Sequence, residues 1–415
     1  MQVRKIIFWL HLMAGVVAGI VVLIMSATGV ALAFEKEIIA WAERNVRRTV
    51  PPVGAKRLPL DELLAKLRTA QPEARPSGVT VYSDPTVAVL MSVGRANGFH
   101  VNPYSGAVQS QGAKKTRAFM QTMVEWHRFL GRQQNHRPVG KAITGACNAA
   151  FCFLAVSGLY LWWPRQWTKS ALRAVLLFNW SLRGKPRDWN WHNVVGLWSA
   201  PVLIVLTATA MPISYRWATD VIYKITRSEP PAPAGSGMVA PGVEVPTPPA
   251  GAKPLSREAL LASVQKKIPQ WSQITLRLDG SGGPRSGGER PRDGATNAPR
   301  GEARPQAVTF VVKQSSGAPR FATAQLTLNP FTGEVLRAEK YADYSLGRRV
   351  RSWTRFLHTG EALGPAGQFV AGLASLGGVV LVYTGFALAV RRFLRRTDPK
   401  PTAMMEMSKT AQSNR

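Results

Sequence analysis

Residues 9–29, WLHLMAGVVAGIVVLIMSATG, align without a gap on residues 190–210, NWHNVVGLWSAPVLIVLTATA. Identical residues fall at matching positions in this register: His11 and His192, Gly15 and Gly196, and Thr28 and Thr209. Both stretches are apolar over enough residues to cross a hydrocarbon core of about 30 Å as a helix. The chain therefore contains an internal repeat, and each copy begins with a membrane span that carries a histidine near one end.

Four apolar runs are long enough to be membrane spans, at 7–34, 140–163, 193–215 and 367–390. The first run ends in Ala31-Leu32-Ala33, which resembles the cleavage site of a secretory signal peptide. Its apolar stretch is longer than the hydrophobic region of such a peptide, so we expect a retained span. The chain is predicted to be a multi-pass protein whose environment is a lipid bilayer.

The distribution of basic residues predicts the orientation of these spans. Lys and Arg are concentrated in the short connection 164–191 and just after the last span, and such segments remain in the cytoplasm. Both termini are then cytoplasmic, and the two long loops face the periplasm or its equivalent. The formal net charge of +30 could also indicate nucleic acid, but no nucleic-acid-binding motif accompanies it, so we expect no such partner.

The two long loops share a second repeat. HVNPYSGAV (100–108) aligns on TLNPFTGEV (327–335), and each Asn-Pro-x-x-Gly piece is typical of a turn between two strands. A helical pattern precedes each turn, followed by alternating strand patterns. Each loop is predicted to be a small α+β domain. In the second loop, segments 228–253 and 279–306 have the composition of a disordered linker and a disordered insert.

The fold class predicted from these features is membrane α-helical. It is a four-transmembrane-helix bundle from two repeated halves, each with a small α+β periplasmic domain. The predicted order is transmembrane helix 1 (1–34), first periplasmic domain (35–138), transmembrane helix 2 (139–163), cytoplasmic basic connection (164–191), transmembrane helix 3 (192–217), second periplasmic domain (218–366), transmembrane helix 4 (367–392) and cytoplasmic tail (393–415).

Each half carries one histidine near the inner face and one near the outer face. The inner pair is His11 and His192, and the outer pair is His127 in WHRFLGR (126–132) and His358 in RFLHTGEALG (355–364). Facing helices of a bundle can present two neutral imidazoles to opposite faces of one haem. No CxxCH motif is present, so covalent c-type attachment lacks support. We expect two haem b groups, with these four histidines as the metal ligands.

Other interpretations of individual residues remain open. A single interfacial histidine is more often an anchor or a packing residue, and only the repeat favours a ligand role. His136 is an alternative outer ligand, and His100 is expected to be structural. Several cations are near enough in sequence to bind haem propionates: Arg128 and Arg355 at the outer face, and Arg4 and Lys5 at the inner face.

Nearly the whole chain resembles the PepSY-associated transmembrane family. The segments that carry the resemblance are WLHLMAGVVAGIVVLIMSATGVALAF, WHRFLG with SGLYLWWPR, WHNVVGLW, and RFLHTGEALG with TGFALAVRR. The resemblance implies PepSY-like periplasmic domains, a place in the inner membrane and a connection to iron uptake. Some members are reductases that release iron from ferric siderophores by means of membrane-embedded haem b.

These features predict an enzyme, a ferric-siderophore or ferric reductase that passes electrons across the membrane. The sequence contains no Rossmann fingerprint, so we expect a separate electron donor, either a cytoplasmic flavin reductase or a quinol. No acid–base or nucleophilic catalytic residue is predicted. The alternatives are a non-redox, membrane-tethered PepSY regulator of periplasmic peptidases and a siderophore or metal-ion permease. The permease is disfavoured because the predicted spans contain no acidic residue that could relay ions.

Overall fold

The computed structural model describes residues 2–94, 97–163, 167–230, 243, 245–248, 251–278 and 306–394. The predicted linker 228–253, insert 279–306 and tail 393–415 lie largely outside these residues. The chain divides into two compact units. We call them the span unit (1–34, 120–216 and 357–415) and the sheet unit (35–119 and 217–356).

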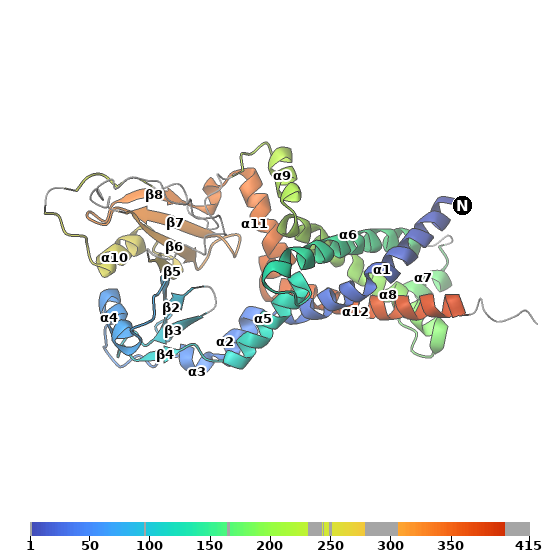
Figure 1. Cartoon of the computed structure of the whole chain (residues 1–415), viewed down its shortest axis with the longest axis horizontal. Coiled ribbons are helices and arrows are strands. Elements are labelled where there is room, and N and C mark those ends of the chain that lie inside the picture. The colour runs from blue at the N-terminus through green and yellow to red at the C-terminus, as the bar shows by residue number, and fades with distance from the viewer. Residues whose placement is uncertain are drawn as a thin grey trace, which may run out of the picture. The chain divides into compact units, whose positions relative to one another are not determined.

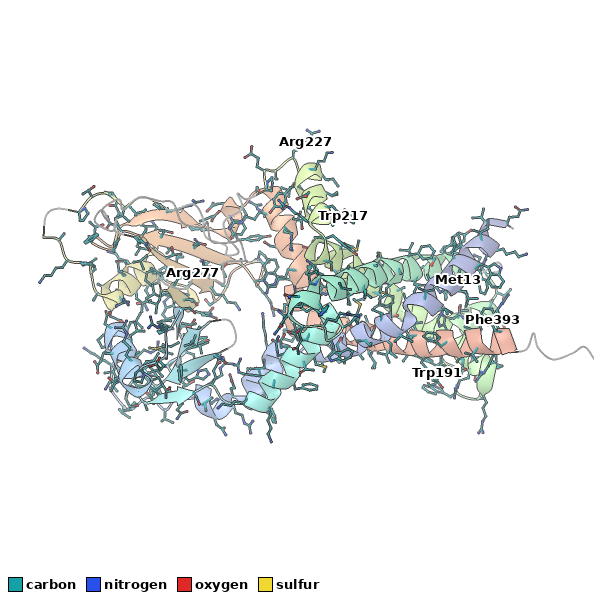
Figure 2. All side chains as sticks on the ribbon, viewed as in Figure 1. Met13, Trp191, Trp217, Arg227, Arg277 and Phe393 are labelled. Atoms are coloured by element: carbon teal, nitrogen blue, oxygen red, sulfur yellow. The ribbon has the colours of Figure 1, made fainter. Side chains whose placement is uncertain are left out.

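Four long helices form the span unit, and Figure 1 labels them. They are α1 (Gln2–Leu32), α6 (Arg137–Trp162), α8 (Gly184–Ser214) and α12 (Gly364–Leu394). Each is apolar and long enough to cross a membrane, which confirms the four predicted spans. Outward-facing side chains such as Met13 and Phe393 are apolar and exposed, as lipid requires (Figure 2).

One boundary differs clearly from the prediction. Helix α8 begins at Gly184, so the last part of the predicted connection 164–191 belongs to the third long helix. His192 consequently lies inside this helix and not at its start.

The remaining α-helices are α2 (Glu35–Ala42), α3 (Arg44–Arg47), α4 (Leu60–Ala70), α5 (Lys114–Phe129), α7 (Lys169–Leu176), α9 (Arg216–Ile225), α10 (Arg257–Lys267) and α11 (Leu346–His358).

Close helix approach in the span unit depends on small residues. A Cβ atom on Gly19 of α1 would lie 2.6 Å from the Phe386 ring of α12. One on Gly378 of α12 would lie 2.6 Å from the Ser26 hydroxyl of α1. Lipid supplies no hydrophobic force between helices, so such close packing is what holds α1 against α12.

The sheet unit contains one antiparallel sheet of eight strands in the order β4-β3-β2-β1-β5-β6-β7-β8. The strands are β1 (Gly78–Tyr82), β2 (Val89–Val93), β3 (Asn97–Val101), β4 (Val108–Ser110), β5 (Trp271–Arg277), β6 (Val308–Gln314), β7 (Thr323–Leu328) and β8 (Val335–Glu339). The two loops were expected to form separate domains, whereas β1 of the first pairs directly with β5 of the second. Thr80 lies opposite Thr275 in this pairing, and their hydroxyls are 3.0 Å apart.

The shared sheet constrains the topology. Its two halves are separated in the chain by two membrane spans, and pairing of β1 with β5 requires both loops on the same side of the membrane. Helices α4 and α10 supply leucines and valines to one common core with strands from both halves, including the fully buried Leu67, Val264 and Phe310. Successive side chains of a strand point to opposite faces of the sheet, so alternate residues of each strand contribute to this core.

The predicted Asn-Pro-x-x-Gly turns are present in both halves. Gly106 and Gly333 adopt φ angles of 73° and 71°, where glycine is favoured. The Asn102 side chain accepts a hydrogen bond from the Tyr104 amide at 2.8 Å, and Asn329 accepts one from Phe331 at 2.9 Å. These side-chain contacts explain why the same residue types recur at both turns.

The two halves of the sheet unit cap each other's helices. The first amide of α4, on Leu60, donates to the Glu258 carboxylate of α10 at 3.1 Å. The first amide of α10, on Arg257, donates to the Asp61 carboxylate of α4 at 2.8 Å. Each carboxylate thus satisfies an otherwise unpaired amide and the positive end of the dipole of the partner helix.

We expect Asp61→Ala to destabilise the start of α10 by about 1 kcal/mol, because the Arg257 amide loses its acceptor. Hydrogen exchange on the full chain should show faster exchange at 257–259, in the opposite half of the repeat. Glu62→Ala is the matched control, since Glu62 makes only a surface pair with Lys66. Acceleration confined to α4 would contradict reciprocal capping.

Candidate functional site

The structure brings the four repeat histidines together as two pairs within the span unit. The ring centroids of His11 and His192 are 6.5 Å apart at an interplanar angle of 84°. Those of His127 and His358 are 6.2 Å apart at 53°. Each pair joins one histidine from each half of the repeat.

In the inner pair, Nδ1 of each ring contacts a hydroxyl. His11 Nδ1 lies 2.9 Å from the Ser157 hydroxyl, and that hydroxyl donates its proton to the Phe153 carbonyl at 2.6 Å. His192 repeats this arrangement with Thr384 at 2.9 Å, whose proton goes to a carbonyl one turn earlier. A hydroxyl that has already donated its proton can only accept, so both Nδ1 atoms must be protonated donors.

In the outer pair, Nδ1 of each ring donates to a backbone carbonyl. His127 Nδ1 lies 3.0 Å from the Met25 carbonyl, and His358 Nδ1 lies 2.9 Å from the Leu206 carbonyl. Met25 and Leu206 match each other in the register that aligns His11 with His192. His127 also contacts the Thr28 hydroxyl at 3.0 Å.

All four rings therefore have the same tautomer, with a proton on Nδ1 and a bare lone pair on Nε2. A carbonyl or hydroxyl that fixes the distal nitrogen is the usual support of a metal-ligating histidine. Burial, helped by His358 and Arg128, lowers the pKa of His127 to about 4, so this ring stays neutral at physiological pH. Neutral imidazole is the form that binds a metal.

Glycines lie against the inner rings. A Cβ atom on Gly158 would be 3.5 Å from Cε1 of His11, and one on Gly385 would be 3.5 Å from Cε1 of His192. Gly15 and Gly196, which lie one turn after the two histidines, face leucine side chains instead. The space beside each ring comes from the facing helix.

The two pairs lie at separate depths. Along α1, His11 belongs to the inner pair and Met25 contacts the outer pair. At 1.5 Å per residue the two levels are roughly 21 Å apart along the helix axis. The arrangement therefore provides one two-histidine site near each end of the bundle.

The other predicted site residues lie outside the pairs. Arg128 is exposed and lies over the Phe129 ring at 5.1 Å, and Arg355 is exposed and lies over Phe356 at 5.8 Å. Arg4 donates to the Leu161 carbonyl at 2.6 Å, near the end of α6. Lys5 is exposed, and so is His136, which lies in a short 3-10 turn away from the outer pair.

His100 is a buried structural residue of the sheet unit, as expected. Only 4% of its side chain is exposed, and Nε2 lies 3.7 Å from the Glu43 carboxylate. Arg117 holds that carboxylate through two hydrogen bonds of 2.6 and 2.7 Å. Burial lowers the pKa of His100, and the nearby Arg47 and Arg117 act in the same direction, while Glu43 opposes them.

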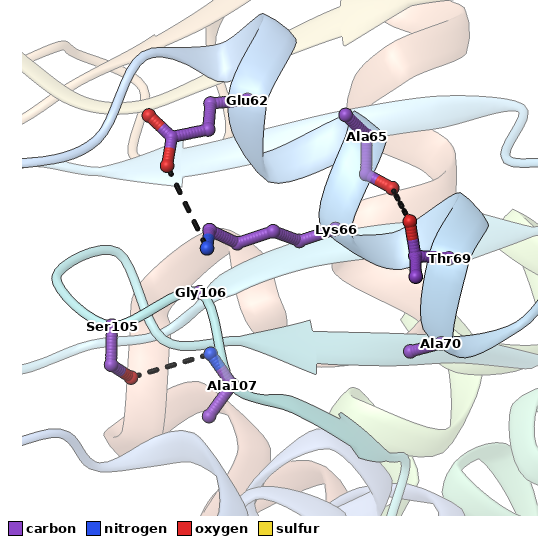
Figure 3. A pocket seen from close by; sticks show the side chains of 8 residues that line it. All are labelled: Glu62, Ala65, Lys66, Thr69, Ala70, Ser105, Gly106 and Ala107. Carbon is purple, nitrogen blue, oxygen red and sulfur yellow. Dashed lines mark hydrogen bonds and ion pairs between the residues drawn. The ribbon is translucent and has the colours of Figure 1, made fainter.

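The sheet unit also carries an open surface depression of about 510 Å³ (Figure 3). It lies between α4 and the turn that follows β3, and its charged groups are Lys66 and Glu62, 3.7 Å apart and roughly half exposed. Such a solvated ion pair contributes little binding energy.

The Nδ1 partners Ser157 and Thr384 were not identified as functional residues from the sequence. The available signal was their matching position beside Gly158 and Gly385, but nothing in the order of residues shows that they contact the histidines. Among the described residues, no group of three or more His, Cys, Asp or Glu could by itself hold a metal ion. Each histidine pair therefore offers a metal two protein ligands.

Comparison with protein families gives one match over most of the chain. The PepSY-associated TM region matches residues 8–392. A comparison with curated proteins finds no match.

The lowered pKa of His100 predicts a pH-dependent sheet unit. The unfolded chain takes up a proton near pH 6.5, whereas folded His100 does so only at lower pH, so stability should fall as the pH drops below about 6.5. Each pH unit within that window costs about 1.4 kcal/mol. The free energy of unfolding, measured by hydrogen exchange of the sheet amides, should decrease in this way between pH 7 and 5. The His100→Gln variant should show a smaller dependence on pH. An equal effect of His136→Gln, at an exposed site, would rule out His100 as the cause.

Proposed function

The chain belongs to the family with a PepSY-associated transmembrane region, and on that premise we propose that it is a transmembrane di-haem b oxidoreductase. It passes electrons across the inner membrane and reduces a ferric siderophore or another ferric chelate in the periplasm, and so aids iron uptake. Its electron donor is a cytoplasmic flavin reductase or a quinol.

The observation that carries this proposal is the spacing of the histidine pairs. Two imidazoles that bind one metal from opposite sides, each with Nε2 about 2.0 Å from it, would have ring centroids roughly 6 Å apart. The two pairs measure 6.5 and 6.2 Å. Two protein ligands do not complete an iron coordination sphere, and the four nitrogens of a porphyrin would supply the rest.

The protein's own groups support this role. Nδ1–H bonds to Ser157, Thr384 and two backbone carbonyls keep each Nε2 free and hold each ring in one orientation. Bound haem would supply reversible one-electron chemistry at each level. A tethered regulator or an anchor does not need the same protonated nitrogen at all four rings.

The proposed direction of electron flow rests on the distribution of basic residues along the chain. Basic residues cluster where α12 ends and in the connection before α8, which favours a cytoplasmic location for these segments. The outer pair then lies toward the periplasm. Siderophores bind Fe(III) through hard oxygen donors and hold Fe(II) far less tightly, so one electron is enough to loosen the metal.

We expect detergent-purified protein to contain about two haem b per chain, released by acid–acetone because no CxxCH motif attaches them. His11→Ala or His192→Ala should remove the inner haem, and His127→Ala or His358→Ala the outer one. Ser157→Ala should weaken inner haem binding by roughly 10- to 100-fold, since His11 loses its orienting acceptor. His136→Ala is the control and should retain both haems. Colourless protein from haem-replete cells would overturn the proposal.

Reduced protein mixed with a ferric siderophore and a ferrous-iron trap should reoxidise its haem while Fe(II) appears. The His358→Ala variant should react much more slowly, because the outer level is the exit for electrons. The reaction is followed by the haem spectrum and the colour of the trap. If the wild-type haem stays reduced with several chemically different ferric siderophores, the substrate assignment is wrong and another periplasmic acceptor must be sought.

A further inference from the structure

The two halves of the repeat differ at the inner end of the span unit. Five and four residues before His192, helix α8 carries Arg187 and Asp188. The register of the repeat places Ile6 and Ile7 at the matching positions of α1. A charged pair beside one inner histidine is thus replaced by two isoleucines beside the other.

Asp188 is a buried carboxylate that holds two guanidinium groups. Only 1% of its side chain is exposed. Its Oδ1 accepts hydrogen bonds from Nε and Nη2 of Arg187 at 3.1 and 2.8 Å. Its Oδ2 lies 2.7 Å from Nη1 of Arg391, on helix α12. The sequence placed Asp188 in the connection before the third span, whereas the structure makes it part of the contact between two long helices.

This cluster carries one more positive charge than negative charge. Two guanidinium groups share one carboxylate, and among the described residues no second carboxylate pairs with either of them. The Arg187 side chain is 38% exposed and the Arg391 side chain is 39% exposed. Each guanidinium has five N–H donors, of which Asp188 occupies only a few. The cluster can therefore bind one further anion while it keeps Asp188.

Arg391 extends toward the inner histidine pair. It follows Thr384, the Nδ1 partner of His192, by seven residues, which is about two turns on the same face of α12. Helix side chains lean toward the start of their own helix, so Arg391 reaches back toward Thr384. Its partner Asp188 lies one turn before His192 on the same face of α8. Contacts from two helices thus place the guanidinium within roughly one helical turn of the His192 ring.

A macrocycle bound by the inner pair would bring one of its edges to the same helix. Helices α1 and α8 each pack against both α6 and α12, so α1 and α8 are at diagonal corners of the bundle. A flat porphyrin between His11 and His192 therefore turns its edges toward α6 and α12. On the α12 side, Gly385 lies against the His192 ring, and Arg391 follows six residues later.

The α6 side does not offer a comparable cation. Arg4, which we expected to bind an inner propionate, donates instead to the Leu161 and Trp163 carbonyls at the end of α6. Haem b carries its two propionate carboxylates on one edge of the ring. Two repeat-related histidines alone would not determine which edge faces which helix, whereas a cation on one side only would do so.

We propose that Arg391, oriented by Asp188, binds a propionate carboxylate of the haem held by His11 and His192. This inference rests on the proposed function. A guanidinium and a carboxylate form charge-assisted hydrogen bonds, which are about twice as strong as neutral ones. Arg391 is thus a positioning residue that fixes which way the inner haem points, and Asp188 acts through it.

The test compares two porphyrins in one protein. The full-length His358→Ala variant, which should keep only the inner haem, is purified without haem and titrated with haem b or with its dimethyl ester, whose propionates carry no charge. Arg391→Leu should weaken binding of haem b roughly 10- to 100-fold, because a hydrogen bond between charged groups is lost. It should not change binding of the ester. Arg187 still pairs with Asp188 in this variant, and Arg391→Lys should restore most of the affinity for haem b.

Arg392→Leu is the matched control, because it removes the same charge at the next residue, which is exposed and lies over the Phe8 ring at 4.9 Å. It should leave binding of both porphyrins unchanged. If Arg391→Leu weakens both porphyrins equally, the cluster only holds α8 against α12. That result, or no weakening of haem b, would overturn the role of Arg391 and leave the di-haem proposal intact. Wild-type protein that binds no haem would instead overturn the proposed function itself.

Discussion

A histidine inside an apolar helix bundle must have both ring nitrogens satisfied, and the span unit is arranged around that requirement. Hydroxyl and carbonyl groups on neighbouring helices satisfy Nδ1 in all four rings. The small residues that let the helices approach also bring these acceptors within 3 Å. With Nδ1 protonated, Nε2 is the basic nitrogen of each ring, and it is the atom through which the proposed iron would be bound.

The sequence predicted the spans, the repeat and the pairing of histidines, because each depends on patterns visible within a short window or on a register between two windows. The Nδ1 partners could not be predicted, since Ser157 is 146 residues from His11 and Thr384 is 192 residues from His192. Arg128 and Arg355 were chosen for their nearness to the outer histidines in sequence, whereas both are exposed and lie over phenylalanine rings.

The repeat is kept closely at positions that shape the scaffold. Reciprocal capping by Asp61 and Glu258 and the matched Met25 and Leu206 carbonyls preserve the internal symmetry closely. The helices before the outer histidines differ, since Met120 and Met123 of α5 correspond to Arg351 and Thr354 of α11.

Pairing of β1 with β5 has a consequence for biogenesis. Thr80 and Thr275 are separated by 195 residues, and two membrane helices must be inserted between the synthesis of one strand and that of the other. Until the second loop has been synthesised, β1 presents a bare strand edge, which is prone to pair with other chains. The newly made protein therefore passes through a stage at which a chaperone, or rapid insertion of the third span, determines whether it matures or aggregates.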